Sequence, residues 1–178
     1  GSSTKFNEAG MDGTLGRDLA PYTWMKAANT ELIKNYSKWY GLKYATVYFY
    51  NVYGPRERAG QFDKAYGTII ETLRQAYLKN KVAPIRKPGT QTRAFTHVDD
   101  TVRGILLAGQ KGQGDDYGIS AKETYSLLQV AKMFGCKTKM LAQTKTSRSS
   151  KAFSSGKIKK LGWKQTQTLK KYIEDTKK

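Results

Sequence analysis

The sequence predicts an α/β protein, with part of a parallel sheet followed by a smaller mixed α/β lobe. Signals for helix and strand alternate up to residue 66, and short strands lie among helices beyond it. The apolar run 44–50, with Val47 and Phe49 among tyrosines, shows no clean polar alternation. Such a run is typical of a strand that is covered on both faces in a parallel sheet.

Each element follows from local signals. Apolar residues at helical spacing predict helices over 22–40, 67–80, 99–109, 124–134, 156–161 and 167–176. Short apolar or β-branched runs predict strands over 44–50, 82–85, 92–96, 117–120 and 139–142. Gly41 ends the first helix, and Thr124 is expected to cap the helix that runs to Phe134.

Three segments are expected to be loops: 1–21, 56–66 and 143–155. The first reads as a strand end followed by polar sequence, in which Gly10, Gly13 and Gly16 interrupt any regular element. The second is charged and is expected to lie on the substrate side.

Length and composition indicate one domain's worth of a globular protein, at 178 residues and 38% hydrophobic. A single cysteine, Cys136, excludes a disulfide framework within the chain and fits a reducing cytoplasm. No apolar run approaches 18 residues and no charged-then-apolar leader is present, so neither a membrane span nor a signal peptide is predicted. The chain starts without Met, which we interpret as a cut end.

The net charge of +18 raises the alternative of nucleic-acid binding. From Lys137 to Lys178 there are 13 lysines and arginines against Glu174 and Asp175, a difference of +11. However, no zinc-finger, RNP-like or Gly-x-x-Gly clamp pattern accompanies this charge, and the basic residues are not interleaved with a stacking platform of aromatics. We favour a solvated basic face with a pocket for a pyrophosphate, and expect no nucleic-acid partner.

The motif that carries chemistry is Tyr22-Thr-Trp-Met-Lys26, at the start of the first helix. Residues four apart share a helix face, so the phenol and the ammonium point the same way. A cation beside a phenol lowers its pKa from about 10, which makes a proton-transfer group usable near neutral pH. Taken alone, the same spacing also describes a packed tyrosine beside a solvated lysine.

Four motifs in order give the pattern a family. The sequence resembles the extended short-chain dehydrogenase/reductases in four motifs that occur in the family's order. These are Ser2-Ser3, Tyr22-x-x-x-Lys26, Asn51-Val-Tyr-Gly-Pro-Arg56, and Gly89-Thr-Gln-Thr-Arg93 with the following Ala-Phe-Thr-His-Val-Asp-Asp. Lys157-Ile-Lys-Lys-Leu-Gly-Trp163 continues the resemblance, which therefore covers nearly the whole chain. The branch it is most similar to is the NAD-dependent sugar-nucleotide epimerases and dehydratases.

The resemblance implies a Rossmann-like sheet, NAD as cofactor and a nucleoside-diphosphate sugar as substrate, with no metal. It implies that Tyr22 is the acid/base, that Lys26 supports its phenolate and holds the nicotinamide ribose, and that Ser3 hydrogen-bonds the same sugar oxygen. Ser3 could otherwise be part of a polar terminus. The only histidine, His97, is expected to be a structural residue at a helix start.

Further positions follow from the same resemblance. Tyr50 would pack near the nicotinamide, or else be a plain strand aromatic. Asn51 would contact the sugar nucleotide, or else cap the next turn. Arg93 and Arg148 would clamp the pyrophosphate, since a guanidinium fork grips phosphate oxygens in pairs; Arg148 could instead be a solvated surface residue. Departures from the family pattern bear on substrate recognition and stand at Ala94, Thr144, Ser154 and Gly156.

One family feature does not occur in this sequence. No Gly-x-x-Gly-x-x-Gly follows a strand, although that loop normally cradles the dinucleotide pyrophosphate. We therefore interpret the chain as the carboxyl-terminal part of such an enzyme. Residues 1–66 would be the end of the dinucleotide-binding domain, with the catalytic helix, and residues 67–178 the sugar-nucleotide lobe, in which 92–110 packs back on the Rossmann part. Another polypeptide would supply the other half, or the sequence is a piece, and the isolated chain is expected to be inactive.

Three functions remain open at this point. The leading hypothesis is an NAD-dependent epimerase or dehydratase. A non-catalytic remnant that binds a sugar nucleotide or a partner chain is the alternative, and a nucleic-acid-binding domain is the weakest. The family also suggests a homodimer through the helix Tyr22–Tyr40.

Overall fold

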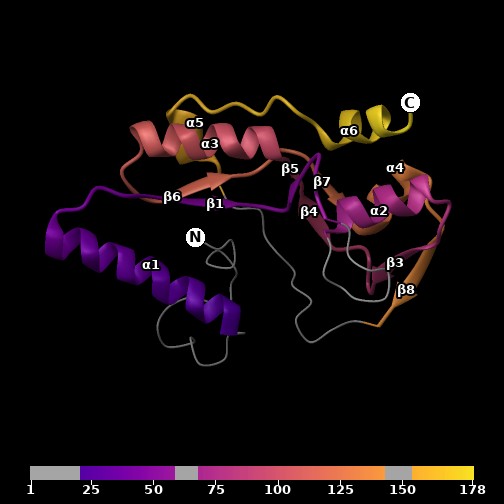
Figure 1. Ribbon diagram of the computed structural model, residues 1–178, viewed down its shortest axis with the longest axis horizontal. Coiled ribbons are helices and arrows are strands. Elements are labelled where there is room, and N and C mark those ends of the chain that lie inside the picture. The colour runs from indigo at the N-terminus through magenta and orange to yellow at the C-terminus, as the bar shows by residue number, and fades with distance from the viewer. Residues whose placement is uncertain (1–20, 59–67, 143–153) are drawn as a thin grey trace. The chain divides into compact units, whose positions relative to one another are not determined.

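The computed structural model describes residues 21–58, 68–142 and 154–178, with side chains from Trp24 onward in the first range (Figure 1). Its helices are α1 (Pro21–Tyr40), α2 (Ile69–Leu78), α3 (Val98–Lys111), α4 (Leu127–Phe134), α5 (Gly156–Lys160) and α6 (Leu169–Thr176). Its strands are β1 (Ala45–Phe49), β2 (Val52–Tyr53), β3 (Ala83–Arg86), β4 (Thr92–Ala94), β5 (Thr96–His97), β6 (Gly114–Ile119), β7 (Thr124–Ser126) and β8 (Thr138–Leu141).

The chain divides into two compact units. The first unit comprises Gly1–Tyr50, Asp100–Ser120 and Ser150–Lys164, and the second comprises Asn51–Asp99, Ala121–Ser149 and Gln165–Lys178. Helices and strands occur in both, and three of the four strand pairs are parallel. The predicted α/β class is therefore confirmed.

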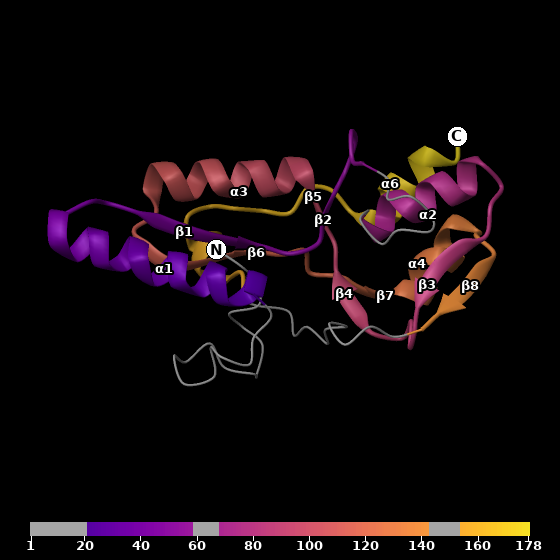
Figure 2. The same cartoon turned by 60° about the horizontal axis from the view of Figure 1, so that its bottom comes forward.

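The first unit is built on the parallel pair β1–β6. In both views α3 lies over one side of this pair and α1 runs along the other (Figures 1 and 2). The run 44–50 is expected to be covered on both faces of the sheet. Thr46, Tyr48 and Tyr50 are buried, but Phe49 is exposed, so the described residues cover one face more fully than the other. The core of this unit consists of Ala108, Tyr117, Ile119, Ile158 and Trp163.

A glycine lets α3 lie close to β6. A Cβ added at Gly104 would come within 2.5 Å of Ile119 Cδ1 and 2.9 Å of its Cγ1. Ile119 is fully buried, so its side chain has little room to move aside. Next to this contact, the Trp163 indole N–H donates to the carbonyl of Asp100 at 2.8 Å. The start of α3 is thus held both by apolar packing and by a buried hydrogen bond.

The second unit contains the parallel pairs β2–β5 and β3–β8 and the antiparallel pair β4–β7. Helices α2 and α4 and strand β3 supply most of its core, which α6 completes with Leu169 and Ile173. The core side chains are Tyr53, Ile70, Leu73, Ala76, Ala83, Ile85, Phe95, Leu127, Val130, Ala131, Phe134, Leu169 and Ile173.

The N-cap expected at Thr124 is wrong. Thr124 begins β7, and the cap of α4 is Ser126, whose Oγ accepts from the Gln129 amide at 3.1 Å. In return, the Ser126 backbone amide donates to Gln129 Oε1 at 2.7 Å, which completes a capping box. Both residue types favour N-caps, but pairing of Thr124 with Ala94 in β4 draws it into a strand.

The expected strand 92–96 is also wrong as a single element. It forms two short strands, β4 and β5, which pair with β7 and β2 respectively, and Phe95 lies between them with its side chain in the core. The strand expected at 117–120 starts three residues earlier, at Gly114.

The described residues contain neither a membrane-spanning helix nor a metal-binding cluster. Within the described ranges, no helix is long and apolar enough to cross a membrane. Nor does any cluster of three or more His, Cys, Asp or Glu side chains in that part of the chain have the arrangement to hold a metal ion.

Candidate active site

Helix α1 carries the Tyr22–Lys26 motif in its first two turns. Continuing from Lys26 in steps of four gives Thr30 and Lys34, and residues four apart follow one ridge of a helix. Thr30 is 6% exposed, and Lys34 forms an ion pair with Asp115 of β6. Thr30 and Lys34 therefore lie on the side of α1 that faces the strand pair, while the Tyr22 side chain lies outside the described side chains.

Lys26 is half-buried on this ridge. Its backbone carbonyl accepts from the Thr30 hydroxyl at 3.0 Å, a bond that runs along the helix. A half-buried ammonium on the sheet side of the helix can support a neighbouring anion, such as a phenolate, better than a fully solvated one.

Tyr50 comes directly after β1, at the carboxyl end of that strand, and is 4% exposed. Open α/β sheets bind their ligands outside the carboxyl ends of the parallel strands. The position of Tyr50 thus suits a nicotinamide contact, while its burial equally suits a core aromatic.

In the second unit, Asn51 is tied to the segment that carries Arg93. Its Nδ2 donates to the carbonyl of Ala94 at 2.9 Å, and its own carbonyl accepts from the Thr96 amide at 3.2 Å. Its φ of 40° is left-handed, a conformation that asparagine tolerates better than most residues. These bonds give Asn51 a clear local role, and a substrate contact would add to it.

Arg93 has a buried nitrogen without a partner. The residue lies in β4, opposite Tyr125 of β7, and its side chain is half-buried. In the described structure its Nε makes no hydrogen bond although water cannot reach it. A buried donor left unpaired costs about 1–3 kcal/mol, more when charged, so this guanidinium suits an anionic partner.

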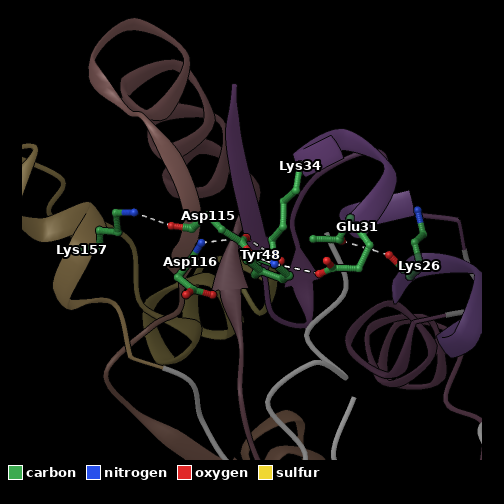
Figure 3. A network of polar contacts seen from close by, with 8 residues as sticks. Lys26, Glu31, Lys34, Tyr48, Asp115, Asp116 and Lys157 are labelled. Atoms are coloured by element: carbon green, nitrogen blue, oxygen red, sulfur yellow. Dashed lines mark hydrogen bonds and ion pairs between the residues drawn. The ribbon is translucent and has the colours of Figure 1, made fainter. Parts of the chain in front are cut away.

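The sequence interpretation passed over two polar positions. Gln91 lies two residues before Arg93, and its Oε1 is likewise buried without a hydrogen bond in the described structure. Asp115 joins side chains from β1, β6 and α1 in one network (Figure 3). The alternation of side chains along a strand could have indicated Gln91, whereas the partners of Asp115 are remote in sequence.

His97 lies at the start of α3, as expected of a structural residue. Its Nδ1 accepts from the backbone amide of Asp99 at 3.2 Å, and its ring packs edge-on against Tyr53 at 5.3 Å between centroids. A ring nitrogen that serves a helix start in a nearly buried side chain is poorly placed for proton transfer to a substrate.

Two groups of the second unit with shifted pKa values, Tyr53 and Glu71, fit a structural role. Burial raises the pKa of Tyr53, so its phenol stays neutral. Burial also acts to raise the pKa of Glu71, but hydrogen bonds from Arg74 and Gln75 outweigh it and the pKa is lowered. Glu71 therefore stays ionised in a closed pairing with Arg74, which leaves it no proton to exchange with a substrate.

Two expected site residues, Ser3 and Arg148, fall outside the described residues. The side chain of a third, Tyr22, is likewise not described. The structure describes Lys26 and Tyr50 in the first unit and Asn51 and Arg93 in the second, where Asn51 is hydrogen-bonded to Ala94, the residue after Arg93.

Comparison with known proteins assigns the chain to one group. The family model described as the NAD dependent epimerase/dehydratase family matches residues 1–120. A UDP-glucuronate 4-epimerase of Thermodesulfobacterium geofontis is 33% identical over 108 residues, which cover 61% of this chain and 30% of the relative.

Solved structures give the same result over more of the chain. A UDP-glucose 4-epimerase of Thermotoga maritima with UDP-glucose superposes with a TM-score of 0.76 at 25% identity, covering 89% of this chain and 52% of that one. A UDP-glucuronic acid 4-epimerase of Bacillus cereus, in complex with UDP-glucuronic acid and NAD, gives 0.75 at 27% identity and covers 88% and 51%. The chain spans about half the length of these structures and about a third of the curated relatives that it matches.

Proposed function

Since the chain belongs to the NAD dependent epimerase/dehydratase family, we propose that it supplies the catalytic helix and the sugar-nucleotide lobe of an enzyme that epimerises or dehydrates a nucleoside-diphosphate sugar. The observation that carries this proposal is the ridge on α1. Tyr22 and Lys26 stand four residues apart on it, and Lys26, the member whose side chain the structure describes, is half-buried.

In this proposal Tyr22, as phenolate, takes the proton from a sugar hydroxyl. Lys26 lowers the pKa of that phenol through its positive charge, and Ser3 hydrogen-bonds the same sugar oxygen. NAD, when bound, supplies the hydride acceptor and donor for the carbon beside that oxygen. Tyr22 would return its proton to the oxygen as the hydride returns to the carbon, which would close the cycle without net oxidation of the sugar.

Arg93 would bind the substrate's pyrophosphate, with Asn51 beside it and Arg148 as the second clamp. The support is the buried, unpaired Nε of Arg93, which a phosphate oxygen would satisfy with a charge-assisted bond. With the catalytic helix in the first unit and Asn51 and Arg93 in the second, proton transfer and nucleotide binding would belong to different units.

The described residues fit one end of the cofactor. Lys26, half-buried on the sheet side of α1, and Tyr50, at the carboxyl end of β1, would hold the nicotinamide and its ribose. The glycine loop for the dinucleotide pyrophosphate does not follow any strand in this sequence, so the proposal gives these residues the nicotinamide end alone.

A homodimer through Tyr22–Tyr40 belongs to the same proposal. Its support is the outward face of α1, where Trp24, Trp39 and Tyr40 are more than half exposed, Trp39 at 63%. Exposed aromatics of this size are enriched at interfaces.

Two titrations test the proposal on the 178-residue chain. Calorimetry with UDP should show binding that Arg93→Ala weakens, and calorimetry with NAD should show no micromolar affinity, because the adenosine end lacks its loop. Micromolar NAD binding would contradict the division of roles. Binding of random DNA that weakens steeply with salt, in place of UDP, would favour the nucleic-acid alternative.

A further inference from the structure

Asp115 is a junction of the first unit. Its Oδ1 accepts from the Tyr48 hydroxyl at 2.7 Å and from the Asp116 amide at 2.8 Å, and its Oδ2 lies 3.4 Å from Lys34 Nζ. Its backbone carbonyl accepts from Lys157 Nζ. One residue therefore connects β1, β6, α5 and α1 (Figure 3).

This carboxylate is held in place before it meets the helix. Tyr48 is fully buried, and the Asp115 side chain is only 12% exposed. Hydrogen bonds to a charged acceptor are stronger than those between neutral groups, and two of them here come from β1 and from the backbone of β6. The strand pair thus presents a fixed negative charge to α1.

Lys34 is the α1 residue that forms an ion pair with this carboxylate, and it follows Lys26 and Thr30 in steps of four residues. It lies eight residues after Lys26, about 12 Å along the axis at 1.5 Å per residue. A continuous helix transmits an axial shift or rotation at one turn to the others. Among the α1 side chains that the structure describes, Thr30 alone is buried, so apolar packing contributes little to this side of the helix.

We propose that Asp115 is a positioning residue for the catalytic helix: through Lys34 it fixes the axial and rotational placement of α1, and with it Tyr22 and Lys26, against the strand pair. This inference rests on the proposed function of that motif. Glu31, one turn before Lys34, is bonded to the same ammonium at 2.8 Å and limits its rotamers.

Hydrogen exchange of the chain tests the anchor without any assay of activity. Lys34→Met should speed exchange of the α1 amides about three- to tenfold, the range expected for loss of one partly buried ion pair, with the β1 and β6 amides unchanged. Lys38→Met, at the next exposed position of the ridge, should leave α1 unchanged, and Lys34→Arg should restore most of the protection. Equal exchange in Lys34→Met and Lys38→Met, or an increase throughout the first unit, would overturn the proposal.

Kinetics of the enzyme that contains this chain give the second readout. Asp115→Asn keeps the shape and the acceptor for Tyr48 but removes the charge that Lys34 meets. It should lower kcat several-fold at unchanged KM for the nucleotide sugar, since binding lies with Arg93. Unchanged kcat in Asp115→Asn would refute the positioning role. So would a loss of kcat in Lys34→Arg as large as that in Lys34→Met, because the arginine keeps the charge that meets Asp115. A wild-type enzyme without turnover would refute the proposed function instead, while the exchange result would still decide the anchor.

Discussion

At the scale of single residues, Arg93 shows how a buried donor can indicate a ligand. Its Nε is closed off from water and makes no hydrogen bond in the described structure, yet a guanidinium cannot shed its charge to avoid that cost. A phosphate oxygen would resolve the deficit. The structure and the motif Gly89-Thr-Gln-Thr-Arg93 thus favour the same role by separate arguments.

Replacing Arg93 should therefore affect binding more than the chemical step. Arg93→Ala removes a contact worth roughly 1.5–3 kcal/mol per hydrogen bond to a charged group, which predicts a KM about ten- to a hundred-fold higher with kcat little changed. Arg93→Lys should recover part of the loss, since a point charge lacks the fork. Steady-state kinetics decide; a collapse of kcat at constant KM would place Arg93 in the chemical step.

Gly104 offers a residue-scale test of packing in the first unit. Gly104→Ala should lower the free energy of unfolding by about 1–3 kcal/mol, because the new methyl overlaps the buried Ile119 side chain. Gly109→Ala, in the same helix but with no atom within 4 Å of its Cβ, is the matched control and should be neutral or stabilising by up to about 1 kcal/mol. Urea titrations of both variants measure the difference, and equal effects would mean that α3 does not lie this close to β6.

What the sequence could predict at this scale depended on local pattern. Lys26 could be placed on the same helix face as Tyr22 because four-residue spacing is enough, and Arg93 could be identified because it follows a turn motif. Asp115 could not be identified, since Tyr48, which donates to it, stands 67 positions away. The side chains of Gln91 and Arg93 could be aligned by strand alternation, but their burial depends on the fold.

At the scale of elements, the presence and order of the helices were predictable, while some of their bounds and the strand pairings were not: α2 is shorter at both ends than its predicted range, and α4 begins three residues after Thr124. The first helix matches its predicted range to within one residue, because a long ridge pattern and Gly41 fix both ends. Strands of two or three residues, such as β2 and β5, carry too little pattern, and they exist through pairing with distant segments. The choice between Thr124 and Ser126 as N-cap was settled in the same way, by pairing of Thr124 with β4.

The capping box makes the corrected N-cap testable. Ser126→Ala should cost about 0.5–2 kcal/mol of stability, because the Gln129 amide at the start of α4 loses its acceptor. Thr124→Ala, at an exposed position of β7, should change the stability by much less. Thermal unfolding of the two variants compares them, and a larger loss for Thr124→Ala would return the cap to the residue that the sequence suggested.

At the scale of the whole molecule, the order of motifs was the most informative signal. Each motif alone fits several proteins, but their succession indicated the family that the match over residues 1–120 shows. The high net charge, by contrast, did not indicate the function, since a solvated basic face and a pyrophosphate-binding site give the same amino-acid composition. Within α1, Thr30 and Lys34 face the strand pair, and the proposed catalytic motif lies in the first turns of the same helix.

The most direct test of this account is turnover of a nucleotide sugar by Tyr22→Phe in the enzyme that contains this chain. Loss of the phenol hydroxyl should lower kcat on the order of 10²-fold or more, the usual scale for removing a general acid or base, with the fold unchanged by circular dichroism. Tyr36→Phe, on the same helix but with an exposed ring, is the matched control and should keep the wild-type rate. A Tyr22→Phe enzyme with near wild-type turnover would contradict the central claim that this helix carries the proton-transfer group.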